Sequence, residues 1–207
     1  MIHTRLFNIN SRNNDDVRLE EVQKLCLERF PDEALIGAEF GVAFGGGLEA
    51  ACRVFGERGR VLGLDTFNGH PRHLSDEPDS FEATCMDHWY EKFGLHAVSE
   101  EHISSELYAC GIHNYELIAG EVHENSISDS VENLHYVLLD LDLIEPMKVS
   151  YENIKDKMVK GGFICVHDVL PADHLPLIHE WWYNEVMPTG RYKEHAPGKY
   201  LGVYEVL

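Results

Sequence analysis

Long apolar segments and paired cysteines are what this sequence lacks. No apolar run approaches the roughly 20 residues that a membrane-spanning helix needs, and the first residues do not resemble a signal peptide. The five cysteines are an odd number without a C-x-x-C spacing, a pattern that is typical of reduced thiols and not of a disulfide framework. We therefore expect a cytoplasmic protein with no membrane partner.

Basic residues are scarce as well. Lys and Arg number 17 against 36 Asp and Glu, which gives a formal net charge of −19 at pH 7. A nucleic-acid surface needs a basic footprint, so nucleic acid is not an expected partner. Most of the carboxylates are expected to be solvated and to aid solubility, with a few left over for a functional site.

Apolar segments alternate with segments of helical periodicity. Strands are expected at residues 36–42, 60–65, 115–119, 136–141 and 163–166. Helices are expected near residues 15–30, 48–56, 146–159 and 172–185, the third of them ended by Lys160-Gly161-Gly162. Continuous apolar strands that alternate with helices indicate a parallel sheet covered on both faces. A C-terminal antiparallel hairpin is expected at residues 191–195 and 200–206.

The length of 207 residues and the apolar fraction of 44% suit a single domain with a full core. The predicted fold class is α/β, a Rossmann-like, seven-stranded sandwich with a mostly parallel sheet. Residues 1–30 are expected to form an N-terminal arm and helix. Residues 66–112 are too many for a plain connection between strands, and we interpret them as a helical lid insertion over the carboxyl edge of the sheet.

A glycine-rich turn follows the first strand, as in open α/β sheets that bind a cofactor at their carboxyl edge. A dinucleotide fold needs G-x-G-x-x-G, whereas here Gly41 and Gly45 are four positions apart, with Gly46 next. Glu39 stands two residues before Gly41, where a carboxylate would repel a pyrophosphate and suits an ammonium or sulfonium group. The turn therefore favours S-adenosylmethionine over a nicotinamide dinucleotide. A glycine-rich turn without a ligand is the alternative.

Acidic residues also follow the second and third strands. Asp65 ends the second strand, where a carboxylate can accept both hydroxyls of an adenosine ribose, and a simple turn acid is its alternative role. Glu121 follows the third strand and is expected to border the adenine. Both residues are therefore candidate cofactor ligands.

A second polar group follows the fourth and fifth strands. Asp140 and Asp142 follow one strand and His167 and Asp168 the other, so neighbouring strands would bring them together at the cofactor edge. Carboxylates and an imidazole in one cleft need a cation or a substrate as compensation. Oxygen ligands suit magnesium, calcium or manganese, and a histidine favours manganese, iron or zinc. Alternatively, His167 is a turn histidine and Asp168 caps the following helix.

Histidines of the expected insertion are candidate general bases, because an imidazole titrates near neutral pH. The first four of them along the chain are at positions 70, 73, 88 and 96. We take His88 as the catalytic candidate among them. Taken separately, each of them is more typical of a surface histidine.

Together these motifs resemble those of class I S-adenosylmethionine-dependent methyltransferases, and more narrowly the macrocin O-methyltransferase family. Residues 39–46 match the family's E-x-G-V-x-x-G-G loop, and residues 65–71 are similar to its D-S-F-x-G-L-P. Residues 140–146 resemble D-x-D-x-Y-E-P/S, and residues 161–168 resemble G-G-x-x-x-x-D-D. The resemblance extends from about residue 36 to the C-terminus.

The resemblance implies that Asp65, Thr66 and Phe67 join the glycine-rich turn in binding S-adenosylmethionine. It also implies that Asp140, His167 and Asp168 hold a divalent metal, magnesium or manganese. The family has aspartate where this chain has His167. Three arrangements therefore stay open: a metal with a softer preference, a metal held by the two aspartates, or no metal and His167 as general base.

The expected function is O-methylation of a hydroxyl on a small-molecule acceptor, a sugar or another polyol or natural product. The catalytic candidates are His167, Asp140 and His88, and a homodimer is the expected assembly. Two rival functions remain. A non-catalytic module that binds S-adenosylmethionine is permitted by His167 in place of an acid, and a nucleotide-dependent oxidoreductase is disfavoured by Glu39.

Overall fold

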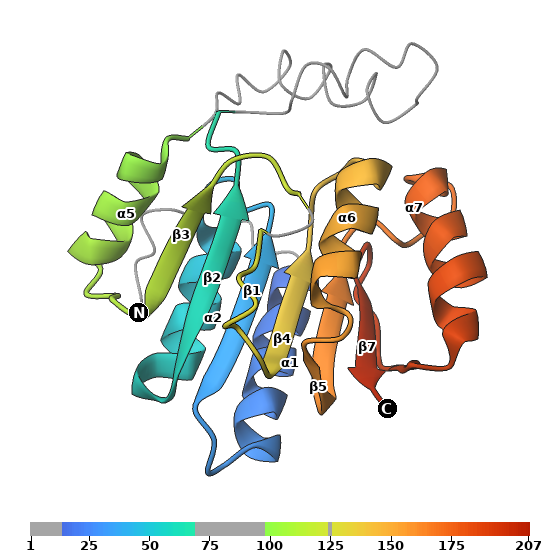
Figure 1. Ribbon diagram of the computed structural model, residues 1–207, viewed down its shortest axis with the longest axis horizontal. Coiled ribbons are helices and arrows are strands. Elements are labelled where there is room, and N and C mark those ends of the chain that lie inside the picture. The colour runs from blue at the N-terminus through green and yellow to red at the C-terminus, as the bar shows by residue number, and fades with distance from the viewer. Residues whose placement is uncertain (1–13, 69–97, 124–125) are drawn as a thin grey trace.

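The computed structural model describes residues 14–68, 98–123 and 126–207 (Figure 1). Within them, seven strands form one sheet in the order β3-β2-β1-β4-β5-β7-β6. The first five in this order run parallel, and β7 is antiparallel to both β5 and β6. The strands are β1 (Leu35–Phe40), β2 (Gly59–Asp65), β3 (Tyr115–Ala119), β4 (Leu134–Leu139), β5 (Met158–Val166), β6 (Tyr192–Glu194) and β7 (Gly202–Val206). The expected α/β fold with its antiparallel hairpin is confirmed.

Helices cover both faces of the sheet. They are α1 (Asn14–Arg29), α2 (Gly46–Phe55), α5 (Glu100–Ala109), α6 (Ile144–Ile154) and α7 (Pro176–Trp181), with short turns η2 (Gly56–Arg58), η3 (Trp182–Val186) and η4 (Met187–Thr189). None of the described helices is long and apolar enough to cross a membrane.

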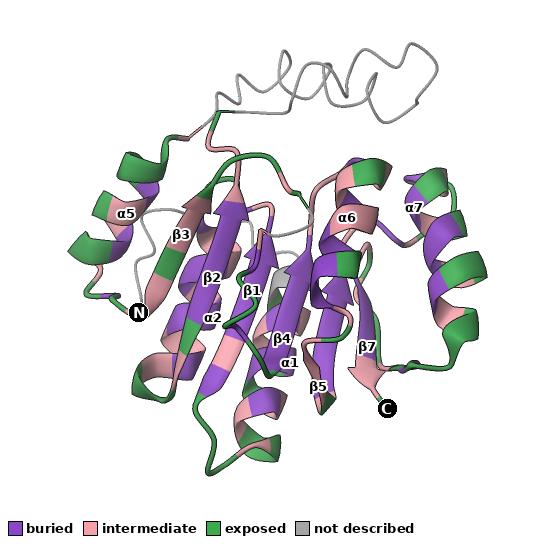
Figure 2. Cartoon of the chain, viewed as in Figure 1, coloured by how far each residue is buried: buried purple, intermediate pink, exposed green. Residues whose placement is uncertain are grey.

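The core has two layers because side chains along a strand alternate between the two faces. β4 is buried throughout (Figure 2). Its Val137 and Leu139 join the layer under α6 and α7, and its Tyr136 and Leu138 join the layer under α1, α2 and α5. The continuous apolar strands of the sequence therefore reflect a sheet that is buried on both sides.

The parallel strands end at one edge of the sheet, the carboxyl edge, where the arrowheads lie in Figure 1. The strand order reverses there between β1 and β4. The Gly41 N–H donates to Leu64 O at 2.9 Å, and the Asp140 N–H donates to Phe40 O at 2.8 Å. Ligands of open α/β sheets bind at such a switch point.

Three expected boundaries were wrong. The helix expected at residues 146–159 ends at Ile154, and β5 begins at Met158 instead of residue 163. Gly161, with a φ of +82°, lies inside this strand and does not end the helix. The register between β4 and β5 shifts at the same end of the pair, as a bulge requires. The helix expected from residue 172 begins only at Pro176.

The expected insertion is described only in part. Its last helix, α5, buries Ile103 and Leu107 in the core layer shared with α1 and α2. This helix therefore covers a face of the sheet and not its carboxyl edge. Residues 69–97, which include His88, lie outside the described residues.

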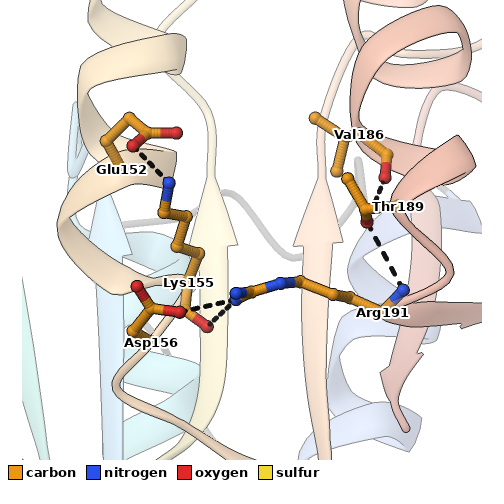
Figure 3. Close-up of polar contacts among 6 residues, drawn as sticks. All are labelled: Glu152, Lys155, Asp156, Val186, Thr189 and Arg191. Atoms are coloured by element: carbon orange, nitrogen blue, oxygen red, sulfur yellow. Dashed lines mark hydrogen bonds and ion pairs between the residues drawn. The ribbon is translucent and has the colours of Figure 1, made fainter.

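Polar contacts connect the end of α6 to the turn before β6 (Figure 3). The Arg191 guanidinium lies 2.7 Å from Asp156 Oδ1 and donates to Lys155 O at 3.2 Å. The Arg191 N–H donates to Thr189 Oγ1 at 3.4 Å. These contacts join elements at the start of β5 and β6, far along the strands from the carboxyl edge of β5.

Candidate functional site

The glycine-rich turn between β1 and α2 lies at the switch point. Gly41 has a φ of +92°, and a Cβ there would stand 1.8 Å from the Asp140 carbonyl oxygen. Only glycine therefore allows the ends of β1 and β4 to approach this closely. Gly45 has a φ of +80° and is the N-cap residue of α2, without a side chain that could cap the helix. The first N–H groups of α2 must therefore find partners other than an N-cap side chain, such as the Glu39 carboxylate for Leu48, a ligand or water.

Asp65 connects this turn to the end of β2. Its Oδ2 accepts the Ala43 N–H at 2.9 Å, and its Oδ1 accepts the Phe67 N–H at 2.8 Å. Each carboxylate oxygen can accept a further hydrogen bond. Asp65 therefore holds the turn in place and retains the capacity to accept ribose hydroxyls.

Glu39 lies beneath the turn. Both of its carboxylate oxygens would be 2.7 Å from a Cβ at Gly47. The Leu48 N–H donates to this carboxylate, while Oε2 has no partner among the described residues. Burial first, and then the charges of Asp140 and Asp65, raise the pKa of Glu39 well above its usual value. A buried acid in this state favours a cationic ligand group nearby.

Asp140, His167 and Asp168 come together at the ends of β4 and β5. His167 Nδ1 lies 3.1 Å from Asp140 Oδ1 and 3.0 Å from Asp168 Oδ2. One ligand atom from each residue lies within 4.8 Å of the others. The three side chains therefore lie close together because they follow the neighbouring parallel strands β4 and β5. The roles of the three residues stay predictions.

The electrostatics of this cluster depend on the two carboxylates. Burial alone would lower the pKa of His167, but Asp140 and Asp168 outweigh it and hold the pKa well above its usual value. Asp168 is buried and adopts a φ of +57°, and Asp142 a φ of +60°. Such conformations are costly for residues other than glycine and persist where the surroundings enforce them, often at functional sites.

His174 was not singled out from the sequence. Its Nε2 lies 3.0 Å from Asp168 Oδ1, on the side of the carboxylate opposite His167. Its ring lies 4.7 Å from the ring of Tyr200, centroid to centroid. The Tyr200 N–H in turn donates to Asp15 at the start of α1. No periodic pattern marks the turn that carries His174, so the sequence offered no signal for it.

The other predicted cofactor residues lie along the same edge. Thr66 and Phe67 follow β2, and Phe67 has a φ of +50° and packs against the α1–α2 core layer. Glu121 is exposed just after β3, whose end is held next to β2 by the Gly120 N–H to Asp65 O bond at 2.9 Å. The position of these residues agrees with a cofactor site, while their contacts with a cofactor remain predictions.

A divalent metal fits the cluster chemically. Two ligands about 2.1 Å from a metal and 90° apart are separated by about 3.0 Å, which is close to the 3.0 and 3.1 Å measured from His167 Nδ1. The buried Nδ1 also has no well-aligned hydrogen bond, because neither oxygen lies where an Nδ1–H would point. Asp140, His167 and Asp168 would be the ligands.

Comparisons with known proteins identify the fold. No family model matches the sequence, and no curated protein matches it. The solved O-methyltransferase NovP has a TM-score of 0.70 and 18% identity, over 91% of this chain and 79% of that chain. The calicheamicin methyltransferase CalS11 has a TM-score of 0.66 and 19% identity, over 95% and 83%. TomG from Streptomyces achromogenes, solved in complex with SAM, has a TM-score of 0.58 and 14% identity, over 90% and 79%.

At these identities the likeness concerns the fold alone. In this chain, the glycine-rich turn and the polar cluster both lie at the carboxyl edge of the seven-stranded sheet. The chain has the fold of these O-methyltransferases.

Proposed function

We propose that this chain is an S-adenosylmethionine-dependent O-methyltransferase that acts on a hydroxyl of a small molecule and uses a divalent metal. The observation that carries the proposal is the meeting of two features at one switch point. Gly41 at the end of β1 is in contact with the backbone of Asp140 at the end of β4. A cofactor above the glycine-rich turn and a hydroxyl at Asp140 would therefore be neighbours.

The cofactor would supply an electrophilic methyl group. The α2 N-terminus and the turn would bind its polar groups, Asp65 would orient the ribose, and Glu39 would compensate positive charge from below. Four carboxylates near the turn, those of Glu39, Asp65, Asp140 and Asp168, make this edge negative. A negative edge suits a sulfonium cofactor and opposes a pyrophosphate.

The metal would supply Lewis acidity that lowers the pKa of an acceptor hydroxyl. Asp140, His167 and Asp168 would hold it and orient the acceptor, and much of the rate enhancement would come from this positioning. With His167 as a ligand, another group removes the proton. His88 stays the candidate, and it lies outside the described residues.

A sugar hydroxyl of a natural product is the proposed acceptor. CalS11 is described as a TDP-rhamnose 3′-O-methyltransferase of calicheamicin biosynthesis, and TomG as an enzyme of tomaymycin synthesis. Adjacent hydroxyls of a sugar or of a catechol could both reach one metal ion. The polar cluster and the kind of chemistry named for these two structures support this proposed acceptor class.

The test has two stages on the same preparation. Calorimetry first measures binding of S-adenosylhomocysteine, and transfer of a labelled methyl group is then followed over a panel of sugars, nucleotide sugars and catechols. Binding followed by transfer is the expected result. Binding without transfer to any acceptor favours the non-catalytic module, and failure of the folded protein to bind contradicts the proposal.

A further inference from the structure

We propose that the cluster at the carboxyl edge selects a first-row transition metal ion over Mg²⁺ and Ca²⁺. His167 Nδ1 is the ligand that produces the selectivity, and His174 is a positioning residue that holds Asp168. This inference rests on the metal part of the proposed function. It adds the class of metal and a role for His174.

The donor atoms are the first argument. Mg²⁺ and Ca²⁺ are hard cations that take oxygen ligands, whereas imidazole nitrogen suits iron, nickel, copper and zinc ions better, and Co²⁺ lies between iron and nickel in the order of affinities. One nitrogen and two carboxylate oxygens converge here, at 3.0 and 3.1 Å from nitrogen to oxygen. A nitrogen in the ligand set therefore shifts the preference away from Mg²⁺.

The hydrogen bonding of His167 is the second argument. Its Nδ1 is buried and lies between Asp140 and Asp168, yet neither contact has hydrogen-bond geometry. A purely structural ion pair would point the N–H at one of the two oxygens. The observed arrangement instead brings one possible ligand atom from each of the three residues within 4.8 Å of the others.

The second carboxylate oxygen of Asp168 is the third argument. His174 Nε2 lies 3.0 Å from Oδ1, so Oδ2 is left on the side of His167 and Asp140. His174 is itself held by the ring of Tyr200, and Asp15 on α1 binds the Tyr200 N–H. Hydrogen-bond partners that orient a metal ligand in this way commonly contribute about 10- to 100-fold to metal affinity.

The experiment is equilibrium metal binding by chelator-stripped, full-length protein. Calorimetry gives the affinities for Mn²⁺, Co²⁺, Zn²⁺, Mg²⁺ and Ca²⁺, and the visible absorption of bound Co²⁺ reports a nitrogen ligand. His167→Asp and His167→Asn replace the nitrogen by oxygen, and His174→Asn removes the positioning ring. His113→Asn, at an exposed histidine before β3, is the control for binding by surface histidines.

Nitrogen–oxygen and all-oxygen sites both favour later transition metals to some degree, so the change in the Co²⁺/Mg²⁺ affinity ratio is the readout. The wild type is expected to favour Co²⁺ over Mg²⁺ by a ratio that falls about tenfold or more in His167→Asp. His174→Asn is expected to weaken all ions by about 10- to 100-fold without changing their order. His113→Asn should match the wild type.

Several outcomes would overturn the inference. They are equal affinities of the wild type for Mg²⁺ and Co²⁺, an unchanged ratio and Co²⁺ spectrum in both His167 variants, or binding that His113→Asn abolishes. Unchanged affinity in His174→Asn would remove the positioning role. Binding of S-adenosylhomocysteine by the same preparations tests the proposed methyltransferase function separately from the proposed metal selectivity. Cofactor binding and chelator-resistant methyl transfer without metal binding would refute this inference and leave methyl transfer standing.

Discussion

Two histidines at opposite ends of neighbouring strands have very different surroundings. His135 lies in β4 near its start. Its Nδ1 accepts the Ile36 N–H at 3.2 Å, and its Nε2 lies 3.2 Å from Glu33 Oε2. The ring packs edge-on against Phe30, with centroids 4.8 Å apart. Both ring nitrogens of His135 have partners, as in a residue that serves the fold.

His167 follows the end of β5. Its Nδ1 lies between two carboxylates without a well-aligned hydrogen bond, and Asp168 beside it has a positive φ. Among the described residues, positive φ values outside glycine also occur at Ala43, Phe67 and Asp142, all after parallel strands, and at Asn133 before β4. Positive φ values outside glycine therefore occur mostly at the carboxyl edge, and strained conformations are tolerated where they serve function.

The largest expected effect concerns the close approach beneath the site. Gly41→Ala would place a Cβ 1.8 Å from Asp140 O, so the ends of β1 and β4 must separate. We expect a loss of about 4 kcal/mol or more in the free energy of unfolding, from overpacking combined with the positive φ. Urea unfolding measures it.

Gly111→Ala is the matched control. Gly111 has a φ of +73° with nothing within 4 Å of a Cβ, so only the conformational cost of about 1–2 kcal/mol applies. Equal losses in the two variants would show that the contact between Gly41 and Asp140 is unimportant.

The next largest effects are expected when His135 and His167 are each replaced by phenylalanine. His135→Phe leaves the partly buried Ile36 N–H without its side-chain partner, so we expect about 1–3 kcal/mol less stability and unchanged methyl transfer per folded molecule. His167→Phe removes a proposed metal ligand, so methyl transfer should fall by about 100-fold or more. Urea unfolding and turnover are measured on both. Full activity in His167→Phe would contradict the assigned role.

A smaller effect is expected at Glu39, and it depends on pH. The folded-state pKa is raised, first by burial, so the associated stability is present in full below the unfolded pKa of about 4.3. It is lost as the pH rises through the raised pKa. Glu39→Gln lacks this loss, so its stability relative to wild type should increase with pH across that window.

The same substitution should weaken S-adenosylhomocysteine binding about tenfold, as expected when a hydrogen bond to a charged group is lost. Urea unfolding from pH 4 to 8 and calorimetry measure the two effects. A stability difference that does not vary with pH would show that Glu39 is ionised in the folded protein without penalty.

The smallest effect is expected at the polar contacts in Figure 3. Arg191 and Asp156 are exposed, with side-chain relative exposures of 45% and 69%. Ion pairs in water contribute about 1 kcal/mol or less, so Arg191→Ala should cost no more than that and leave methyl transfer unchanged. Stability is read from urea unfolding. A loss comparable to that of Gly41→Ala would mean that this end of the fold is as critical as the switch point.

The sequence alone predicted the elements whose signals are local. Strand β4 is a continuous apolar run, and its end places Asp140 beside residues 167 and 168 because adjacent parallel strands end at one edge. The start of β5 was missed because Lys160-Gly161-Gly162 has the composition of a helix end. Only the register of β4 and β5 shows that the glycines lie inside a strand.

Contacts between distant segments were also beyond the sequence. Asp15 binds Tyr200, Tyr200 packs on His174 and His174 contacts Asp168, although α1 and the last turn are far apart along the chain. The burial of Glu39 beneath Gly47 likewise depends on how α2 packs over β1. Local patterns located the candidate site, and tertiary packing decided which side chains complete it.

Every role proposed for these residues depends on S-adenosylmethionine binding at the carboxyl edge of the sheet. Calorimetric titration of S-adenosylhomocysteine into the folded protein tests it most directly, with His135→Phe as a variant altered only at the opposite edge. We expect saturable binding at one site per chain, retained in His135→Phe and weakened in Glu39→Gln. A folded wild-type protein that produces no binding heat at several temperatures, and does not retain the labelled ligand in equilibrium dialysis, would contradict it.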